Sequence, residues 1–439
     1  MFDNSFRVKL RLGISFFILV VLTPLFISTT DSHFFNHNSQ TVEAAYIKAR
    51  PLSGGPTVND PNLKVDIVFK NSGKLDTPTT SMAFLGPNDI LVLEKNKGTV
   101  RRIVNGHLES DPLLQVPVGN EVEWGMLGIA ISQNPGKTYV FLYYTEAKGV
   151  GGNAGVLGNR LYRYELVNDK LVNPLLLLDL PATSPLLGQE NNHNGGKVVI
   201  GPDGNLYVVI GDVGSHNGQA QNNEKGDPMD GTSGILRVTP DGQPVGGGIL
   251  GDSIPLRLYY AYGIRNSFGF DFDPITGTIW DTENGALDKD ELNIVKPGFN
   301  SGWSQVMGFP PKRFDPQSLV TFDGRGQYSN PQFVWKQTVG PTALKFLNSA
   351  KLGNQYENTM FVGDVNNGDI YNLKLNSARN ELLLTGPLSD HMADTPEEEQ
   401  SIIFGQGFGV VTDIKVGPDG YLYILGYDGT IYKISPINS

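Results

Sequence analysis

The residues best placed to do chemistry in this sequence lie in one segment, Asn191–Gly214. A histidine, His193, precedes a pair of glycines, Gly195 and Gly196. The glycines leave room for a large flat group to approach the backbone, and a near-neutral imidazole can accept a proton at physiological pH. Two β-branched runs follow, separated by the turn Gly201–Gly204. We expect His193 at the mouth of a strand–turn–strand unit, where loops often carry function. A buried histidine bonded only to backbone is the alternative.

A repeating unit accounts for the elements that position this segment. Each copy has a turn, an apolar strand, a short link and a second strand that begins near glycine. The six copies begin at Gly86, Asn134, Gly201, Asp273, Asn358 and Gly417. Blades of a β-propeller have four strands and need about 40–50 residues each. The repeat therefore predicts an all-β, six-bladed β-propeller, and Val65–Phe69 is the candidate strand that completes the last blade, because closure removes an exposed edge. Two stacked β-sandwiches are the alternative, and they would not explain six similar units.

The first residues predict export. Arg7, Lys9 and Arg11 precede an almost wholly apolar run, residues 12–28, which is typical of an export signal. The run is long for a signal and short for a membrane span, so a cleaved signal peptide and a retained membrane anchor both stay open. We assign residues 1–30 to this segment, residues 31–61 to a polar linker and residues 62–437 to the propeller. The predicted location is extracytoplasmic, either secreted or attached to the outer face of the cell membrane.

Composition narrows the possible partners and the source of stability. The chain of 439 residues has a formal net charge of −11 and no cysteine. Net negative charge, without a basic cluster beyond the first dozen residues, argues against a nucleic-acid surface. Exported proteins often carry disulfides. Since this chain has none, we expect a large core to provide its stability, with bound metal as a candidate addition.

Four segments together resemble the soluble glucose/sorbosone dehydrogenase family. They are Glu123–Ala130, Asn191–Gly214, Ala261–Gly269 with its continuation to Trp303, and Thr412–Gly420. The resemblance covers about residues 75 to 435. Members of this family are six-bladed propellers that use pyrroloquinoline quinone (PQQ) and calcium. The resemblance therefore implies a dehydrogenase that acts on a small sugar with these two cofactors, through an electron acceptor that the sequence leaves open.

The resemblance also implies roles for individual residues. His193 matches a base that takes the proton of a sugar hydroxyl, and Asn192 stands where members often have an aspartate that orients this base. Arg265 and Asn266 match a pair that lies against the quinone, which suits the charge and planar shape of a guanidinium. A salt bridge from Arg265 to Glu283 is the alternative. The other implied contacts are Asn284 and Thr338 with the cofactor, Glu123 with the substrate, and the backbone carbonyls of Gly285 and Ala286 with calcium. A plain turn is the alternative for the last two.

The sequence departs from the family where the three carboxylates of the quinone are held. Asn366, Val410 and Thr412 stand at positions that carry a lysine and two arginines in well-characterised members. Without these cations the quinone forfeits several charge-assisted hydrogen bonds of roughly 1–3 kcal/mol each.

Three functions therefore stay open. The first is an exported quinone-dependent aldose dehydrogenase with His193 as base. The second is a metal-dependent lactone or sugar-acid hydrolase that uses Glu123, Asn192, Asp212 and Asn284 as oxygen ligands. The third is a non-catalytic propeller that binds a glycan or a surface partner.

Overall fold

The computed structural model describes residues 54–149, 155–185 and 191–438. The predicted export segment, residues 1–30, lies outside the described residues, and so does most of the predicted linker. Within the described ranges, no helix has the length and apolar character needed to cross a membrane.

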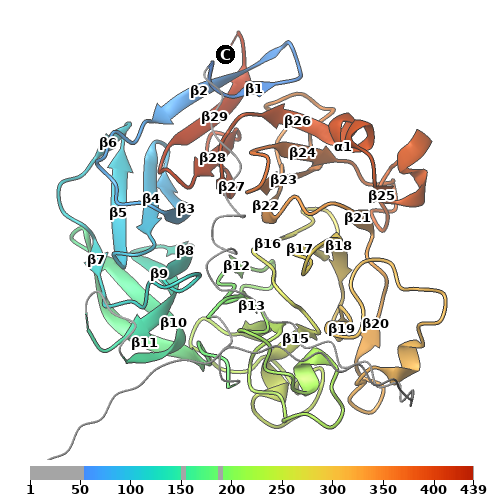
Figure 1. Ribbon diagram of the computed structural model, residues 1–439. Coiled ribbons are helices and arrows are strands. Elements are labelled where there is room, and N and C mark those ends of the chain that lie inside the picture. Colours follow the sequence, from blue (N-terminus) through green and yellow to red (C-terminus); the bar gives the residue numbers. More distant parts are fainter. Residues whose placement is uncertain (1–53, 150–154, 186–190, 439) are drawn as a thin grey trace, which may run out of the picture.

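Nearly all regular structure is β-strand, and the described strands are grouped in six sheets (Figure 1). The first sheet contains β3 (Thr79–Gly86), β4 (Asp89–Glu94), β5 (Thr99–Val104) and β6 (His107–Leu108), with β7 (Leu114–Gln115) also paired to β5. The second contains β8 (Met126–Asn134), β9 (Lys137–Ala147), β10 (Val156–Val167) and β11 (Lys170–Leu180). The third contains β12 (Val198–Ile200), β13 (Leu206–Ile210), β14 (Gly234–Val238), β15 (Tyr259–Tyr262), β19 (Phe299–Asn300) and β20 (Gln327–Tyr328).

The remaining three sheets follow in chain order. The fourth contains β16 (Gly269–Phe272), β17 (Ile279–Glu283), β18 (Asp290–Val295), β21 (Phe333–Trp335) and β25 (Met392–Ala393). The fifth contains β22 (Pro341–Phe346), β23 (Met360–Asp364), β24 (Ile370–Leu373), β26 (Ile403–Gln406) and β1 (Thr57–Val58). The sixth contains β27 (Val411–Val416), β28 (Leu422–Gly426), β29 (Ile431–Pro436) and β2 (Leu63–Phe69). One short α-helix, α1 (Pro396–Ile402), and four 3₁₀ turns lie between the strands of the described chain; the turns are η1 (Gln219–Gln221), η2 (Leu256–Leu258), η3 (Pro316–Ser318) and η4 (Gly386–Asp390).

The sheets are arranged in a ring, with β3, β8, β12, β16, β22 and β27 innermost (Figure 1). The all-β propeller predicted from the sequence is therefore confirmed, and each of the six repeat units lies in a different sheet. The end of the ring is closed by a strand from each end of the described chain. Val65 pairs with Ile434 and Ile67 with Tyr432 in the β2–β29 ladder, so the prediction that Val65–Phe69 completes the last sheet is also confirmed.

Apolar side chains pack between neighbouring sheets and supply the core of this cysteine-free chain. Every residue of β13 is buried. One cluster joins the first and sixth sheets through Met82, Val92, Tyr423 and Leu425. Burial of such side chains contributes roughly 1.5–3 kcal/mol each, so each sheet is held to its neighbours along the ring. This packing fixes the inner strands, whose ends carry the predicted site.

Candidate functional site

His193 lies just before β12 in a left-handed backbone conformation, with φ of 60°, and only 8% of the residue is exposed. Gly195 and Gly196 also have positive φ. A Cβ on Gly195 would lie 2.5 Å from the Val209 carbonyl oxygen, and a Cβ on Gly196 would lie 2.6 Å from the Leu127 Cβ. The expectation that these glycines leave room for a flat ligand is therefore wrong, because β8 and β13 fill that space.

The imidazole of His193 is held by Asp212. Nδ1 lies 2.5 Å from Asp212 Oδ1, and the Asp212 side chain is fully buried. Asp212 Oδ2 accepts a hydrogen bond of 2.7 Å from Trp303 Nε1. A carboxylate at Nδ1 favours the tautomer that carries its proton there, so the lone pair of Nε2 stays available to take a proton. Among the described residues, none forms a hydrogen bond with Nε2 of His193. This arrangement suits a general base.

Asp212 remains ionised although it is buried. Burial raises its pKa, but the charge of His193, the hydrogen bond with its ring, the charge of Arg265 and the Trp303 donor lower it, and the net pKa lies below the ordinary value. Gly211 allows this convergence, because its Cβ would contact both Arg265 O and, at 2.6 Å, His193 O. The Asp212 backbone N–H also donates to Arg265 O at 2.9 Å.

The side chain that holds His193 is thus Asp212 rather than the predicted Asn192. The Asn192 side-chain oxygen is buried and has no hydrogen-bond partner among the described residues. The family resemblance suggested Asn192, whereas the β12–β13 ladder decides the contact. Val198 pairs with Val208, and continuing this antiparallel register brings His193 beside the residues that follow β13. The signal in the sequence that could have identified this partner is the pair Gly211-Asp212, which directly follows the second apolar run of the segment.

Glu123 reaches the same loop from the start of the second sheet. Its Oε2 accepts a hydrogen bond of 3.1 Å from the backbone N–H of Asn194. Asn194 is fully buried and is fixed by Asn159, whose amide donates to its side-chain oxygen at 2.7 Å, and by Tyr143, whose hydroxyl donates to its carbonyl at 3.0 Å. Glu123 is itself half-buried. The structure therefore places it beside His193, where the sequence predicted a substrate contact.

Arg265 lies on the other side of Asp212. Its Nη1 donates to the carbonyl oxygens of Asn284 at 2.9 Å and Gly285 at 3.0 Å. Its guanidinium carbon lies 5.3 Å from the centre of the Trp303 ring, within the range of a cation–π interaction. Trp303 therefore contacts both Asp212 and Arg265, and it links the base to the cation.

The alternative role for Arg265, a salt bridge to Glu283, is not what the described side chains form. Glu283 Oε1 accepts from the backbone N–H of Arg265 at 2.7 Å, and Oε2 accepts from the Ser301 hydroxyl at 2.6 Å. Burial raises the pKa of Glu283 to about 7, although these two donors and the charge of Arg265 oppose the rise. Glu283 thus fixes the backbone of Arg265, and the Arg265 guanidinium donates instead to the carbonyl oxygens of Asn284 and Gly285.

The other predicted cofactor contacts mostly hold loops together. The Asn284 amide donates to Asn266 O at 3.2 Å and Pro341 O at 3.0 Å. The Thr338 hydroxyl donates to Asp290 Oδ2 at 2.8 Å, and that carboxylate also accepts from the backbone N–H groups of residues 285, 339 and 340. The side-chain oxygen of Asn266, by contrast, is buried without a partner in the described part of the chain. Asn266 is therefore the member of this group with an unpartnered polar atom, and that atom is buried.

The residues present do not fit calcium as the resemblance implies it. Gly285 O already accepts from the Arg265 guanidinium, and a cation at the same oxygen would face that positive charge. Ala286 is exposed in the adjoining turn. Among the described residues, no group of three or more His, Asp or Glu side chains is arranged to hold a metal ion.

They also do not fit the three carboxylates of PQQ in the implied pose. The Asn366 amide donates to Thr338 O at 3.0 Å, and the Thr412 hydroxyl lies 3.3 Å from Leu425 O. Val410 is 8% exposed and apolar. These three side chains add no charge, and the two polar ones are bonded to backbone carbonyls.

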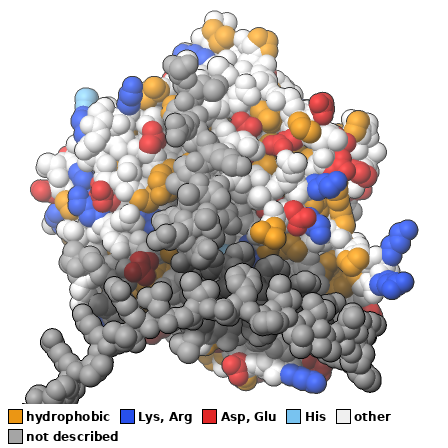
Figure 2. All heavy atoms as spheres, in the orientation of Figure 1, with side chains coloured by type: hydrophobic (Ala, Val, Ile, Leu, Met, Phe, Trp, Pro, Cys, Tyr) orange, Lys and Arg blue, Asp and Glu red, His pale blue; other side chains and the backbone are white. Residues whose placement is uncertain are grey.

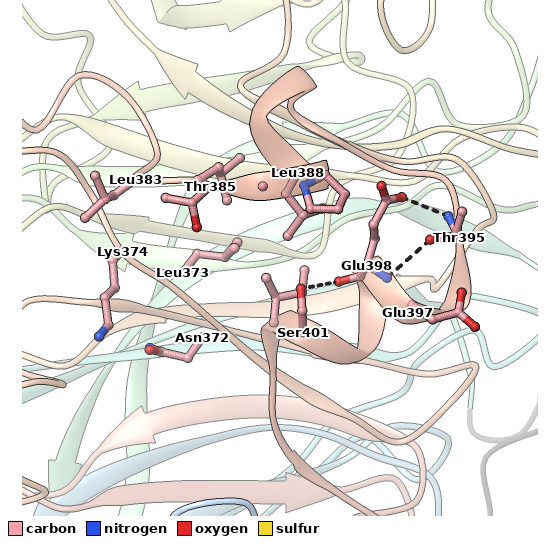
Figure 3. Close-up of a pocket in the computed structure, with 14 residues that line it drawn as sticks. Asn372, Leu373, Lys374, Leu383, Thr385, Leu388, Thr395, Glu397, Glu398 and Ser401 are labelled. Atoms are coloured by element: carbon pink, nitrogen blue, oxygen red, sulfur yellow. Dashed lines mark hydrogen bonds between the residues drawn. The ribbon is translucent and has the colours of Figure 1, made fainter.

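A cavity lies elsewhere, beside α1. It has a volume of about 710 Å³ and lies between β24, η4 and α1, and none of the predicted site residues lines it (Figure 3). Its carboxylate Glu398 caps the helix, because Oε2 accepts from Thr395 N at 3.0 Å and from Asp394 N at 2.9 Å. We place the candidate site at His193, where an imidazole, a buried carboxylate and a guanidinium converge.

One face of the molecule shows how surface charge is distributed. On the part of that face not covered by grey atoms, Lys and Arg side chains are scattered among Asp and Glu side chains (Figure 2). This face therefore presents mixed charge rather than one field of a single sign.

The inner loops of this propeller hold a histidine–aspartate pair beside an arginine. This combination of side chains is suited to catalysis. The glucose/sorbosone dehydrogenase family profile matches residues 75–433, and the chain belongs to this family. It is 27% identical over 373 residues to an aldose sugar dehydrogenase of Escherichia coli, covering 83% of this chain and 91% of the relative.

Solved structures agree with the fold. A glucose dehydrogenase-type oxidoreductase from Thermus thermophilus is 26% identical with a TM-score of 0.65, covering 85% of this chain and 99% of that one. The PQQ-bound aldose sugar dehydrogenase of Streptomyces coelicolor is 22% identical with a TM-score of 0.58, covering 86% and 99%. The latter likeness supports the propeller fold alone.

Proposed function

We propose that the protein is a sugar dehydrogenase that oxidises a hydroxyl group of an aldose, with His193 as the base. The observation that carries this proposal is the chain of contacts from His193 through Asp212 to Trp303, with Arg265 beside it. Family membership and the Escherichia coli relative support the reaction class. We also propose that each of the six sheets is one propeller blade.

Oxidation of a CH–OH group to a carbonyl removes two electrons and two protons. In the proposed reaction, Nε2 of His193 takes the hydroxyl proton, and the C–H hydrogen leaves with its electron pair to an acceptor of the quinone class. Asp212 stabilises the imidazolium that forms, because its carboxylate stays ionised beside Nδ1. Arg265 supplies positive charge close to the developing anion on the acceptor. The residues at 366, 410 and 412 do not fit the carboxylates of PQQ, so the proposed reaction does not depend on that cofactor.

We propose that residues 1–30 direct the protein out of the cytoplasm, as a secreted or membrane-anchored form. The cationic start and the apolar run at residues 12–28 support this location. The intact mass of protein recovered from the outside of cells would decide between cleavage and retention, and recovery from the cytoplasm alone would contradict export.

The function is tested by a screen of aldoses against quinone acceptors with a redox dye as readout. Wild type should turn over at least one aldose, and His193→Gln should lose about 10²–10⁴-fold in kcat/KM. The matched control is His216→Gln. His216 forms the same kind of pair, with Nδ1 2.5 Å from Asp230 Oδ2, and its loss should leave turnover within a few-fold.

Two results would contradict the proposal. Equal rates for wild type and His193→Gln would show that His193 is not the base. Sugar binding without turnover for any acceptor would favour a non-catalytic glycan-binding propeller, which the neutral side chains at 366, 410 and 412 would also suit.

A further inference from the structure

Three loops that adjoin Asn284, the residue whose carbonyl accepts from Arg265, form a continuous wall without cationic side chains. Residues 338–341, 365–368 and 408–412 contain no Lys or Arg. Val365 N donates to Gly340 O at 3.0 Å, and Phe408 N donates to Gly368 O at 3.0 Å, so the three loops are joined edge to edge. The amide of Asn366 is bonded back to Thr338 O within the wall.

Buried carboxylates lie next to these three loops, and they disfavour the binding of a further negative charge. Asp290 is fully buried behind residues 338–340, and burial raises its pKa although four donors oppose the rise. Burial raises the pKa of Asp364, behind residues 367–369, to about 7. Asp212 and Glu283 flank Arg265. The charge of Arg265 lowers the pKa of both Asp212 and Glu283, so one guanidinium already balances two acidic groups. Two like charges about 5 Å apart repel by on the order of 3 kcal/mol at an effective dielectric constant near 20.

The polar atoms left free at the site also describe the ligand. Among the described residues, Arg265 Nε, Asn266 Oδ1 and Asn192 Oδ1 are buried and have no hydrogen-bond partner. They number one donor and two acceptors, and because each has almost no accessible surface, a ligand reaches them only if the groups that bury them shift. A quinone carbonyl needs one donor and a sugar offers hydroxyl donors, whereas each carboxylate of a tricarboxylate needs several donors of its own.

We infer that the electron acceptor bound at this site is an uncharged quinone and not a tricarboxylate. This inference rests on the proposed function, which supplies the oxidation itself. The reaction balances as aldose CH–OH plus quinone giving C=O plus hydroquinone, with two electrons and two protons transferred. Arg265 contacts one quinone carbonyl, and the neutral wall packs against the ring.

Binding separates this inference from catalysis. The full protein is titrated with PQQ and with its trimethyl ester, which keeps the ring and removes the three charges, with and without calcium, and quenching of tryptophan fluorescence is recorded. The ester should bind at least 10-fold more tightly than PQQ. Added salt should not weaken the residual binding of PQQ, because residues 338–341, 365–368 and 408–412 carry no cation that attracts it.

A charge-restoring variant gives the converse result. The triple substitution Asn366→Lys, Val410→Arg, Thr412→Arg should reverse the preference by about 10²–10³-fold, since each charge-assisted contact contributes roughly tenfold. The matched control, Asn366→Gln with Val410→Leu, should keep the wild-type preference.

The outcomes are distinct. PQQ binding tighter than the ester, or binding of neither compound, would overturn the inference. The salt titration of wild type decides the matter even if the triple variant does not fold. Ester binding without sugar oxidation would refute the proposed function, and only the preference of the site for an uncharged quinone would remain.

Discussion

Replacement of Asp212 by asparagine tests how the base is held. Asp212 accepts from both His193 Nδ1 and Trp303 Nε1. An asparagine has one acceptor oxygen and one donor amide on that side chain, so it can serve only one of the two partners. Either Trp303 loses its acceptor, or His193 must change tautomer and place its proton on Nε2. A buried polar group without a partner costs about 1–3 kcal/mol, and loss of the correct tautomer should lower kcat/KM by about 10²–10⁴-fold.

The stability effect has a defined pH dependence. The pKa of Asp212 is lowered in the folded protein, so its ionised form stabilises the fold above the unfolded pKa near 3.8, and this stabilisation is lost as the pH falls through the folded value. Urea unfolding should therefore show the full deficit of Asp212→Asn at pH 7 and a smaller one near pH 3.

The matched control for that variant is Asp230→Asn, which alters the His216 pair. Asp230 is partly exposed, so the variant should lose some stability and keep its activity. If Asp212→Asn matches wild type in stability at pH 7 and in kcat/KM, the account of the base is refuted.

Three further substitutions follow from the geometry. Gly211→Ala should lower the free energy of unfolding by about 1–3 kcal/mol, because its Cβ would contact Arg265 O and His193 O; unchanged thermal unfolding would argue against this convergence of loops. Lys415→Met should stabilise the fold, because burial and the charges of Lys197 and Lys345 lower the Lys415 pKa from 10.5 to about 8. The gain, at most about 3 kcal/mol, should be complete below pH 8 and vanish toward pH 10.5, and a constant gain across that range would contradict it. Trp303→Phe should raise the pKa of Asp212 by removing its donor, so in urea unfolding the Asp212 contribution to stability should be lost at a higher pH than in wild type, whereas an equal loss of stability at every pH would indicate a packing role alone.

The fold was predictable because its signals are local and repeated. Each unit pairs a Gly/Pro/Asn/Asp turn with apolar strands, and each lies in its own sheet. The closing strand Val65–Phe69 is the exception, since its partner is distant in sequence. This strand could still be inferred, because the last sheet of the ring would otherwise keep an unpaired edge at β29.

The site was harder, because its contacts depend on register and on competition among polar groups. Asp212 reaches His193 through the β12–β13 ladder, which no neighbouring residue reveals. The Gly285 carbonyl and the Thr338 hydroxyl each found a partner within the protein, Arg265 and Asp290. Residue types indicated what these groups can bind, whereas the folded chain determines which of them remain free.

The central claim is that His193 removes a proton from an aldose as the sugar is oxidised. The most direct measurement follows an aldose labelled with ¹³C at C1 by NMR, in the presence of the purified protein and an uncharged quinone. Wild type should convert the label to the lactone or aldonate carbon with one equivalent of hydroquinone, and His193→Gln should form at least 100-fold less in the same time. Absence of the oxidised carbon with wild type, or its equal formation by His193→Gln, would contradict the account.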